Sequence, residues 1–212
     1  MAYRYHPLPW AGGWGKASLI LYLHGFRSSP LSAKAQQLKQ YMEDAGLGDQ
    51  FCCPQLPISP LAAIALAENT IKQADRPVTL VGSSLGGYYA AWLMDQHQLR
   101  IHHVVLVNPA VNADRSETFI GTQTNWHTGE SFEFTQKHVA ELKALDVPLV
   151  RHQERYWLLV ETGDEVLDYR LAVAKYSDAR QTVLEGGDHS FTRWADYLEE
   201  IAALDTPVKA RS

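Results

Sequence analysis

The sequence is poor in cysteine, in clustered basic residues and in long apolar runs. Its two cysteines are the neighbours Cys52 and Cys53. Adjacent cysteines rarely bond to each other, and these form no CxxC pair, so a reducing compartment is expected. The formal net charge is −5 at pH 7, and no run of Lys and Arg is longer than two residues. This charge pattern argues against nucleic acids and acidic membrane surfaces as partners.

Segments that would anchor the chain in a membrane are also missing from the sequence. Residues 1–16 lack an uninterrupted apolar stretch, and the apolar run from Leu19 to Leu23 is too short to cross a bilayer. We therefore expect a cytoplasmic protein without a membrane partner. At 212 residues, with 46% hydrophobic and 20% charged residues, the chain has the size and composition of one globular domain.

A GxSxG motif lies between a strand-like and a helix-like segment. Residues 78–81 are β-branched and aliphatic, which indicates a buried strand, and the residues after Leu85 are helix formers with an apolar stripe. Between them, residues 82–86 place Ser84 at the centre of the motif. Such a match arises by chance in roughly one chain of this size in ten to twenty, so the flanking segments carry the argument. They predict a sharp strand-to-helix turn that exposes the Ser84 hydroxyl as a nucleophile.

The rest of the chain alternates strand-like and helix-like segments, which predicts a three-layer α/β fold with a mostly parallel sheet. Residues 1–16, rich in proline, glycine and aromatic residues, are expected to form a packed arm, and residues 17–212 a single domain. Residues 110–154 interrupt the alternation and predict a small cap-like insertion. The expected strands are 18–23, 51–53, 78–81, 101–107, 156–160 and 182–184, and the expected helices are 32–45, 60–74, 86–95, 136–145, 169–176 and 193–204.

A serine nucleophile needs a base that accepts its proton and an acid that orients the base. Ligand sites in open α/β sheets lie outside the carboxyl ends of the strands, so both partners should follow strands. Asp164 comes directly after the strand at 156–160 and is the predicted acid; Asp168 is the alternative, although it suits a helix N-cap. His189 follows the last strand and the glycines 186–187, and is the predicted base.

Two backbone N–H groups are predicted to bind the oxyanion of the reaction. Leu85 follows the nucleophile, and Phe26 follows the first strand. His24, next to this loop, is expected to support it. The other histidines show no shared spacing typical of metal ligands, so neither a metal nor another cofactor is expected.

Aromatic residues of the 110–154 insertion are candidates for an acyl pocket. Trp126 and Phe132, together with Phe119 and Phe134, are placed to line it. Ordinary core or surface packing is an equally good interpretation of these four side chains.

Several motifs in order give the chain a family resemblance. It resembles the YqiA-type bacterial esterases of the α/β-hydrolase superfamily over roughly residues 18–205. The motifs are Tyr22-Leu23-His24-Gly25-Phe26, Ser28-Ser29-Pro30, Pro54-Gln55-Leu56-Pro57, Gly82-Ser83-Ser84-Leu85-Gly86-Gly87-Tyr88-Tyr89, Asn108-Pro109-Ala110, Thr162-Gly163-Asp164-Glu165-Val166-Leu167-Asp168-Tyr169 and Gly186-Gly187-Asp188-His189-Ser190-Phe191.

The resemblance implies an α/β-hydrolase fold and a small cytoplasmic serine esterase. Such an enzyme cleaves short acyl esters, with acyl-CoA thioesters as a second substrate class, through the triad Ser84, Asp164 and His189. The chain departs from the family in residues 1–16, which look like an extension, and in Asp188, where the family often has Asn.

Three alternatives to an esterase stay open. A catalytically silent α/β-hydrolase fold would serve as a binding module, and an acyltransferase or peptidase would use the same triad on another substrate. The glycine-rich turn also joins a strand to a helix, as phosphate-binding loops do, but it lacks both their GKS or GKT ending and the GxGxxG spacing.

Overall fold

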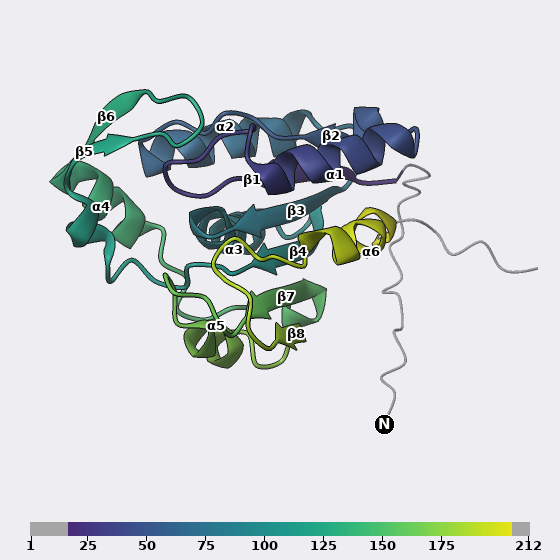
Figure 1. Ribbon diagram of the computed structural model, residues 1–212. Coiled ribbons are helices and arrows are strands. Elements are labelled where there is room, and N and C mark those ends of the chain that lie inside the picture. The colour runs from purple at the N-terminus through teal and green to yellow at the C-terminus, as the bar shows by residue number, and fades with distance from the viewer. Residues whose placement is uncertain (1–16, 205–212) are drawn as a thin grey trace, which may run out of the picture.

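The computed structural model describes residues 17–204 (Figure 1), so the expected arm at residues 1–16 lies outside the described residues. A six-stranded sheet has the order β2-β1-β3-β4-β7-β8, and every neighbouring pair is parallel. Its strands are β1 (Leu19–Leu23), β2 (Phe51–Cys52), β3 (Val78–Ser83), β4 (Ile101–Val107), β7 (Tyr156–Glu161) and β8 (Arg180–Leu184).

Helices cover both faces of this sheet, which confirms the predicted three-layer architecture. One apolar core joins the sheet to α2, α3, α4 and α5, and the other joins it to α1 and α6. Strand side chains alternate between the two cores, as Leu21 and Tyr22 do, which is why β1 is apolar on both faces. The helices are α1 (Ala33–Asp44), α2 (Pro60–Gln73), α3 (Leu85–His97), α4 (Gln136–Ala144), α5 (Tyr169–Lys175) and α6 (Leu198–Ala203).

Residues 110–154 leave the sheet after β4 and return at β7. They contain α4 and an antiparallel hairpin of β5 (Gly121–Thr124) and β6 (Ser131–Phe134), which the sequence pattern did not predict. The hairpin lies beside the loop after β1, because the N–H of Trp126 donates to the Arg27 carbonyl at 2.9 Å. The amide of Asn125 also donates to the Ser28 carbonyl at 2.8 Å. The insertion is therefore hydrogen-bonded to the loop after β1, at the carboxyl ends of the strands, where the predicted site lies.

The prediction of a single closing helix at 193–204 is wrong for the first part of this segment. A 3₁₀ turn, η4 (Trp194–Tyr197), precedes α6. The indole N–H of Trp194 donates to the Lys34 carbonyl at 3.0 Å, and the guanidinium of Arg193 binds Glu161 at 2.9 Å. Because contacts outside the helix hold both residues, the regular helix begins only at Leu198. Within residues 17–204, no helix is both long and apolar enough to cross a membrane.

Candidate active site

Ser84 lies on the turn between β3 and α3 in a strained backbone conformation. Its φ of 54° and ψ of −121° fall in a region that non-glycine residues rarely occupy. The flanking glycines are required by close packing. A Cβ atom on Gly82 would lie 2.4 Å from the Gly86 carbonyl oxygen, and one on Gly86 would lie 1.9 Å from the Leu23 carbonyl oxygen. This packing explains the GxSxG pattern: both glycines let the turn close tightly under the raised serine.

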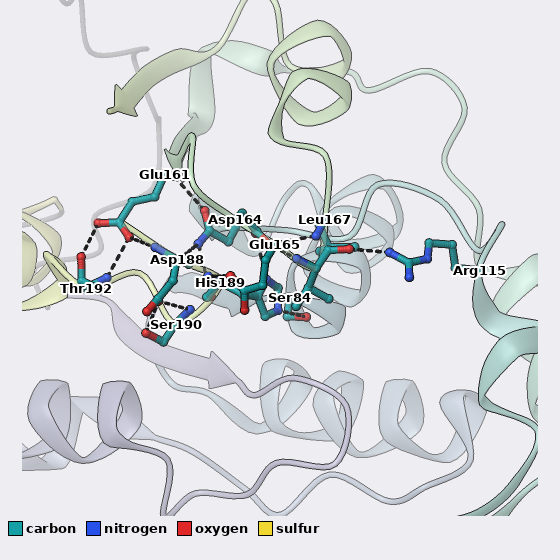
Figure 2. Close-up of polar contacts among 12 residues, drawn as sticks. Ser84, Arg115, Glu161, Asp164, Glu165, Leu167, Asp188, His189, Ser190 and Thr192 are labelled. Carbon is teal, nitrogen blue, oxygen red and sulfur yellow. Dashed lines mark hydrogen bonds and ion pairs between the residues drawn. The ribbon is translucent and has the colours of Figure 1, made fainter. Parts of the chain in front are cut away.

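His189 lies between Ser84 and Asp164, as Figure 2 shows. Its Nε2 is 3.0 Å from the Ser84 Oγ, and its Nδ1 is 2.8 Å from Asp164 Oδ2. Asp164 is almost fully buried at 1% side-chain exposure, and its other oxygen accepts the N–H groups of Val166 and Leu167 at 2.9 and 2.8 Å. A carboxylate held in this way favours the imidazole with its proton on Nδ1, so that Nε2 is free to accept the serine proton.

The two carboxylates near Asp164 have other contacts. Asp168 caps α5, where it accepts the N–H of Arg170 at 3.0 Å and pairs with the Arg170 guanidinium. The side chain of Glu165 accepts the backbone N–H of His189 at 3.1 Å. The structure therefore brings Asp164, and not Asp168, to the imidazole of His189.

Glu161, the last residue of β7, is a fully buried carboxylate that sequence reasoning missed. It accepts the N–H groups of Asp188 and Thr192 and the Thr192 hydroxyl, each at 2.9 Å, as well as the Arg193 guanidinium. Burial alone would raise the pKa of Glu161, but the hydrogen bonds from Arg193, Thr192 and Asp188 outweigh it and lower the pKa to about 2. The loop that carries His189 is thus hydrogen-bonded to a carboxylate that is negatively charged at neutral pH.

Asn108, at the end of β4, holds the same loop from the other side of β7. Its amide donates to the carbonyls of Asp188 and His189 at 2.9 and 3.2 Å, and its side-chain oxygen accepts the N–H of Glu161 at 2.9 Å. Asp188 turns its carboxylate toward the N–H and hydroxyl of Ser190. The sequence marked Asn108 only as a polar residue directly after a predicted strand and as part of the Asn108-Pro109-Ala110 motif, and neither signal indicated these contacts.

His24 supports the loop after β1, as expected. Its Nε2 accepts the N–H of Leu56 at 3.1 Å, and its Nδ1 donates to the Gly25 carbonyl at 3.0 Å. Burial lowers the pKa of His24, and the hydrogen bond to Gly25 only partly offsets this. The imidazole is neutral and ties the loop to the chain after β2.

The two predicted oxyanion donors lie beside the nucleophile. Leu85 and Phe26 line the same cavity as Ser84, and within residues 17–204 neither N–H donates to a protein acceptor. Leu85 opens α3, where the first N–H groups have no carbonyl partner in the helix. The arrangement can place two donors on a carbonyl oxygen bound next to Ser84.

The cavity at this site has a volume of about 980 Å³. Phe119, Phe134 and Leu142 form an apolar part of its wall, and Trp126 lies at its rim with 66% exposure. Phe132 instead lines a neighbouring cavity of about 440 Å³, which shares Phe26 with the first. The assignment of Trp126 and Phe132 to an acyl pocket stays a prediction. In the described part of the chain, no group of three or more His, Cys, Asp or Glu side chains is arranged to hold a metal ion.

The sheet order, the strained turn at Ser84 and the serine–histidine–aspartate geometry define an α/β-hydrolase fold. Solved structures agree. A putative hydrolase from Agrobacterium vitis S4 is 19% identical with a TM-score of 0.68, covering 89% of this chain and 88% of that one. Mouse alpha/beta hydrolase domain-containing protein 10 is 15% identical with a TM-score of 0.69 and 90% coverage of both chains. Est1E from Butyrivibrio proteoclasticus is 13% identical with a TM-score of 0.65, covering 89% of this chain and 87% of that one.

The model of the uncharacterised protein family UPF0227 matches residues 19–206 of the chain. The chain therefore belongs to UPF0227, the family of the YqiA-type proteins, which confirms the resemblance inferred from its motifs.

Proposed function

We propose that the protein is a serine esterase that hydrolyses acyl esters through a covalent acyl-enzyme. The observation that carries the proposal is the continuous hydrogen-bonded chain from the Ser84 hydroxyl through His189 to buried Asp164, at a strained turn beside two free N–H groups. A binding protein would have no need for a base oriented in this way on a serine. The likeness to a putative hydrolase and to an esterase domain of a Rhodothermus marinus protein supports the same class.

The proposed reaction has two steps. Ser84 Oγ attacks the ester carbonyl while His189 Nε2 takes its proton, and the N–H groups of Leu85 and Phe26 bind the oxyanion. His189 then gives the proton to the departing alcohol, which leaves the acyl group on Ser84. Water, deprotonated by His189, attacks this ester and releases the acid. Asp164 stabilises the imidazolium in both steps.

The proposed substrates are short acyl esters, with thioesters as a second class. The apolar wall formed by Phe119, Phe134 and Leu142 suits an alkyl chain. A thioester reacts by the same steps, with a thiol as the leaving group.

Replacing triad residues tests this function. Ser84→Ala and His189→Ala should each lower kcat for a short aryl ester by about 10⁴-fold to 10⁶-fold, with little further loss in the double variant, because both residues act in one step. Steady-state hydrolysis of p-nitrophenyl butanoate measures this. Asp168→Asn is the matched carboxylate control and should keep most of the activity.

Labelling with a fluorophosphonate, followed by peptide mass spectrometry, identifies the activated residue independently of the substrate. An adduct on Ser84 that is lost in His189→Ala is expected. Folded wild-type protein that takes up no label would contradict the proposal and favour the binding module.

A further inference from the structure

Lys34 is a cationic side chain in the wall of the cavity that contains Ser84 and His189. It lies in the first turn of α1, and its Nζ donates to the Ser190 carbonyl at 2.6 Å. Ser190 directly follows His189. The ammonium group is therefore bound to the loop that carries the histidine of the proposed triad.

The charge of Lys34 is not neutralised by direct contact with a carboxylate in the described part of the chain. The Ser190 carbonyl is its one hydrogen-bond partner there, although an ammonium has three donors. Asp188, Asp164 and Glu161 act on it only from a distance, and each is engaged with another partner. Burial lowers the pKa of Lys34, and these carboxylates partly offset the effect, so that the pKa is about 8 and the side chain is mostly protonated at pH 7.

The same wall contains a hydroxyl group that has no hydrogen-bond partner among the described residues. Ser32 precedes α1, and its hydroxyl oxygen is the one buried side-chain polar atom within residues 17–204 that has no hydrogen bond. Buried hydroxyls are normally paired, because an unpaired one costs free energy. Ser32 and Lys34 both line the cavity, so a ligand there can use both.

The geometry of the triad decides which part of a substrate would meet these groups. The carbonyl oxygen must point to the N–H groups of Leu85 and Phe26, and the leaving group must lie against His189 Nε2, which returns the proton to it. Lys34 is bonded to the residue next to His189. The lysine therefore belongs to the side of the cavity that carries His189, where the leaving group departs, and the apolar wall is left for the acyl chain.

We propose that Lys34 and Ser32 bind an anionic group, a carboxylate or a phosphate, on the alcohol or thiol that leaves Ser84. This inference rests on the proposed esterase function and specifies its substrates. The acidic residues of the cavity come from other segments: Asp114 follows β4, and Glu165 and Asp168 follow β7. Glu165 accepts the backbone N–H of His189 and Asp168 pairs with Arg170, so these two carboxylates are engaged with other groups.

Three butanoyl esters test the inference at pH 7. The leaving groups are para-hydroxybenzoate, its neutral methyl ester and para-hydroxyphenyl phosphate. The quantity measured is the ratio of kcat/KM for each anionic ester to kcat/KM for the neutral one. Lys34→Met should lower this ratio roughly ten-fold relative to wild type, since a hydrogen bond to a charged group is lost. The carboxylate and phosphate arms show which anion is preferred.

Two variants serve as controls for this experiment. Lys39→Met removes an exposed lysine that lies on the same helix and pairs with Glu43, and it should leave the ratio unchanged. Lys34→Arg keeps the positive charge and should retain most of the preference. Added salt should also weaken the wild-type preference by screening the charge, which provides a measurement that needs no variant.

The outcomes separate this inference from the esterase proposal. An unchanged ratio in Lys34→Met, with all esters still hydrolysed through Ser84, would overturn the anion site and leave the esterase function intact. If wild-type protein hydrolyses none of the esters and Ser84 takes no label, both proposals fail.

Discussion

At the scale of single residues, Gly187 has no side chain, and this lets the Glu161 carboxylate approach the loop that carries His189. A Cβ atom on Gly187 would lie 1.9 Å from Glu161 Oε2, whereas one on Gly186 would meet nothing within 4 Å. Both glycines have a positive φ, 71° and 74°. An alanine at either position therefore carries similar backbone strain, and only Gly187→Ala also displaces the carboxylate.

This difference makes the two glycines a matched pair. Gly186→Ala should lower the free energy of unfolding by about 1 kcal/mol and keep esterase activity, because it adds strain alone. Gly187→Ala should in addition lower kcat by on the order of a hundred-fold, since it moves the loop that carries His189. Denaturant unfolding and ester hydrolysis measure the two effects. Equal activity in both variants would show that Glu161 does not position the histidine.

At the scale of elements, the β5–β6 hairpin supports the loop that carries the proposed oxyanion donor. The Phe26 ring packs against three aromatic rings at centroid distances of 5.1 to 5.9 Å, those of Phe119, Phe132 and Phe134. The next residue, Arg27, has a φ of 58° and donates to the Thr124 carbonyl at 3.0 Å. The insertion thus fixes the direction of the Phe26 N–H.

Loosening the hairpin should therefore affect catalysis without touching the triad. Asn125→Asp removes the amide donor to Ser28 but keeps the side-chain oxygen that accepts the N–H groups of His127 and Thr128. We expect kcat to fall on the order of ten-fold, with a smaller change in KM, because the donor contributes chiefly in the transition state. Thr128→Ala is the control, since its hydroxyl bonds only within the turn. A change in KM alone would mean that the hairpin binds substrate and does not position the donor.

The sequence predicted the elements with strong apolar patterns and missed those without one. The strand at 101–107 has the predicted bounds, because five of its seven residues, all except His102 and His103, are aliphatic and buried. In contrast, β5 is Gly-Thr-Gln-Thr and half exposed, so no apolar alternation marks it. Ser84, Asp164 and His189 could be predicted to meet because each follows a strand, but the contacts of Glu161 and Lys34 could not be predicted. Those contacts join segments far apart in the chain, and sequence spacing carries no information about them.

At the scale of the whole molecule, Glu161 makes the free energy of unfolding depend on pH in the acid range. Its pKa is lowered from 4.5 to about 2 in the folded protein. A lowered carboxylate pKa stabilises the folded state above the unfolded pKa, and the effect is lost as the pH falls toward the folded pKa. The contribution is on the order of 3 kcal/mol at neutral pH, and it disappears between about pH 4.5 and pH 2.

Glu161→Gln should therefore be less stable than wild type at pH 7, and the difference should shrink as the pH falls below about 4.5. Denaturant unfolding at a series of pH values measures the difference in free energy. Glu199→Gln, on the exposed face of α6, should show no such trend. A constant difference between Glu161→Gln and wild type down to pH 2 would contradict the lowered pKa.

The order of the strands also divides the parts of the site between two halves of the sheet. The serine turn and both proposed oxyanion N–H groups come from the chain around β1 and β3, which lie side by side. Asp164 and His189 follow β7 and β8, which complete one edge of the sheet. Ser84 can therefore meet its base only when β7 and β8 have joined the sheet. We expect turnover to recover no earlier than helical signal in a refolding experiment, because turnover requires these contacts between segments far apart in the chain.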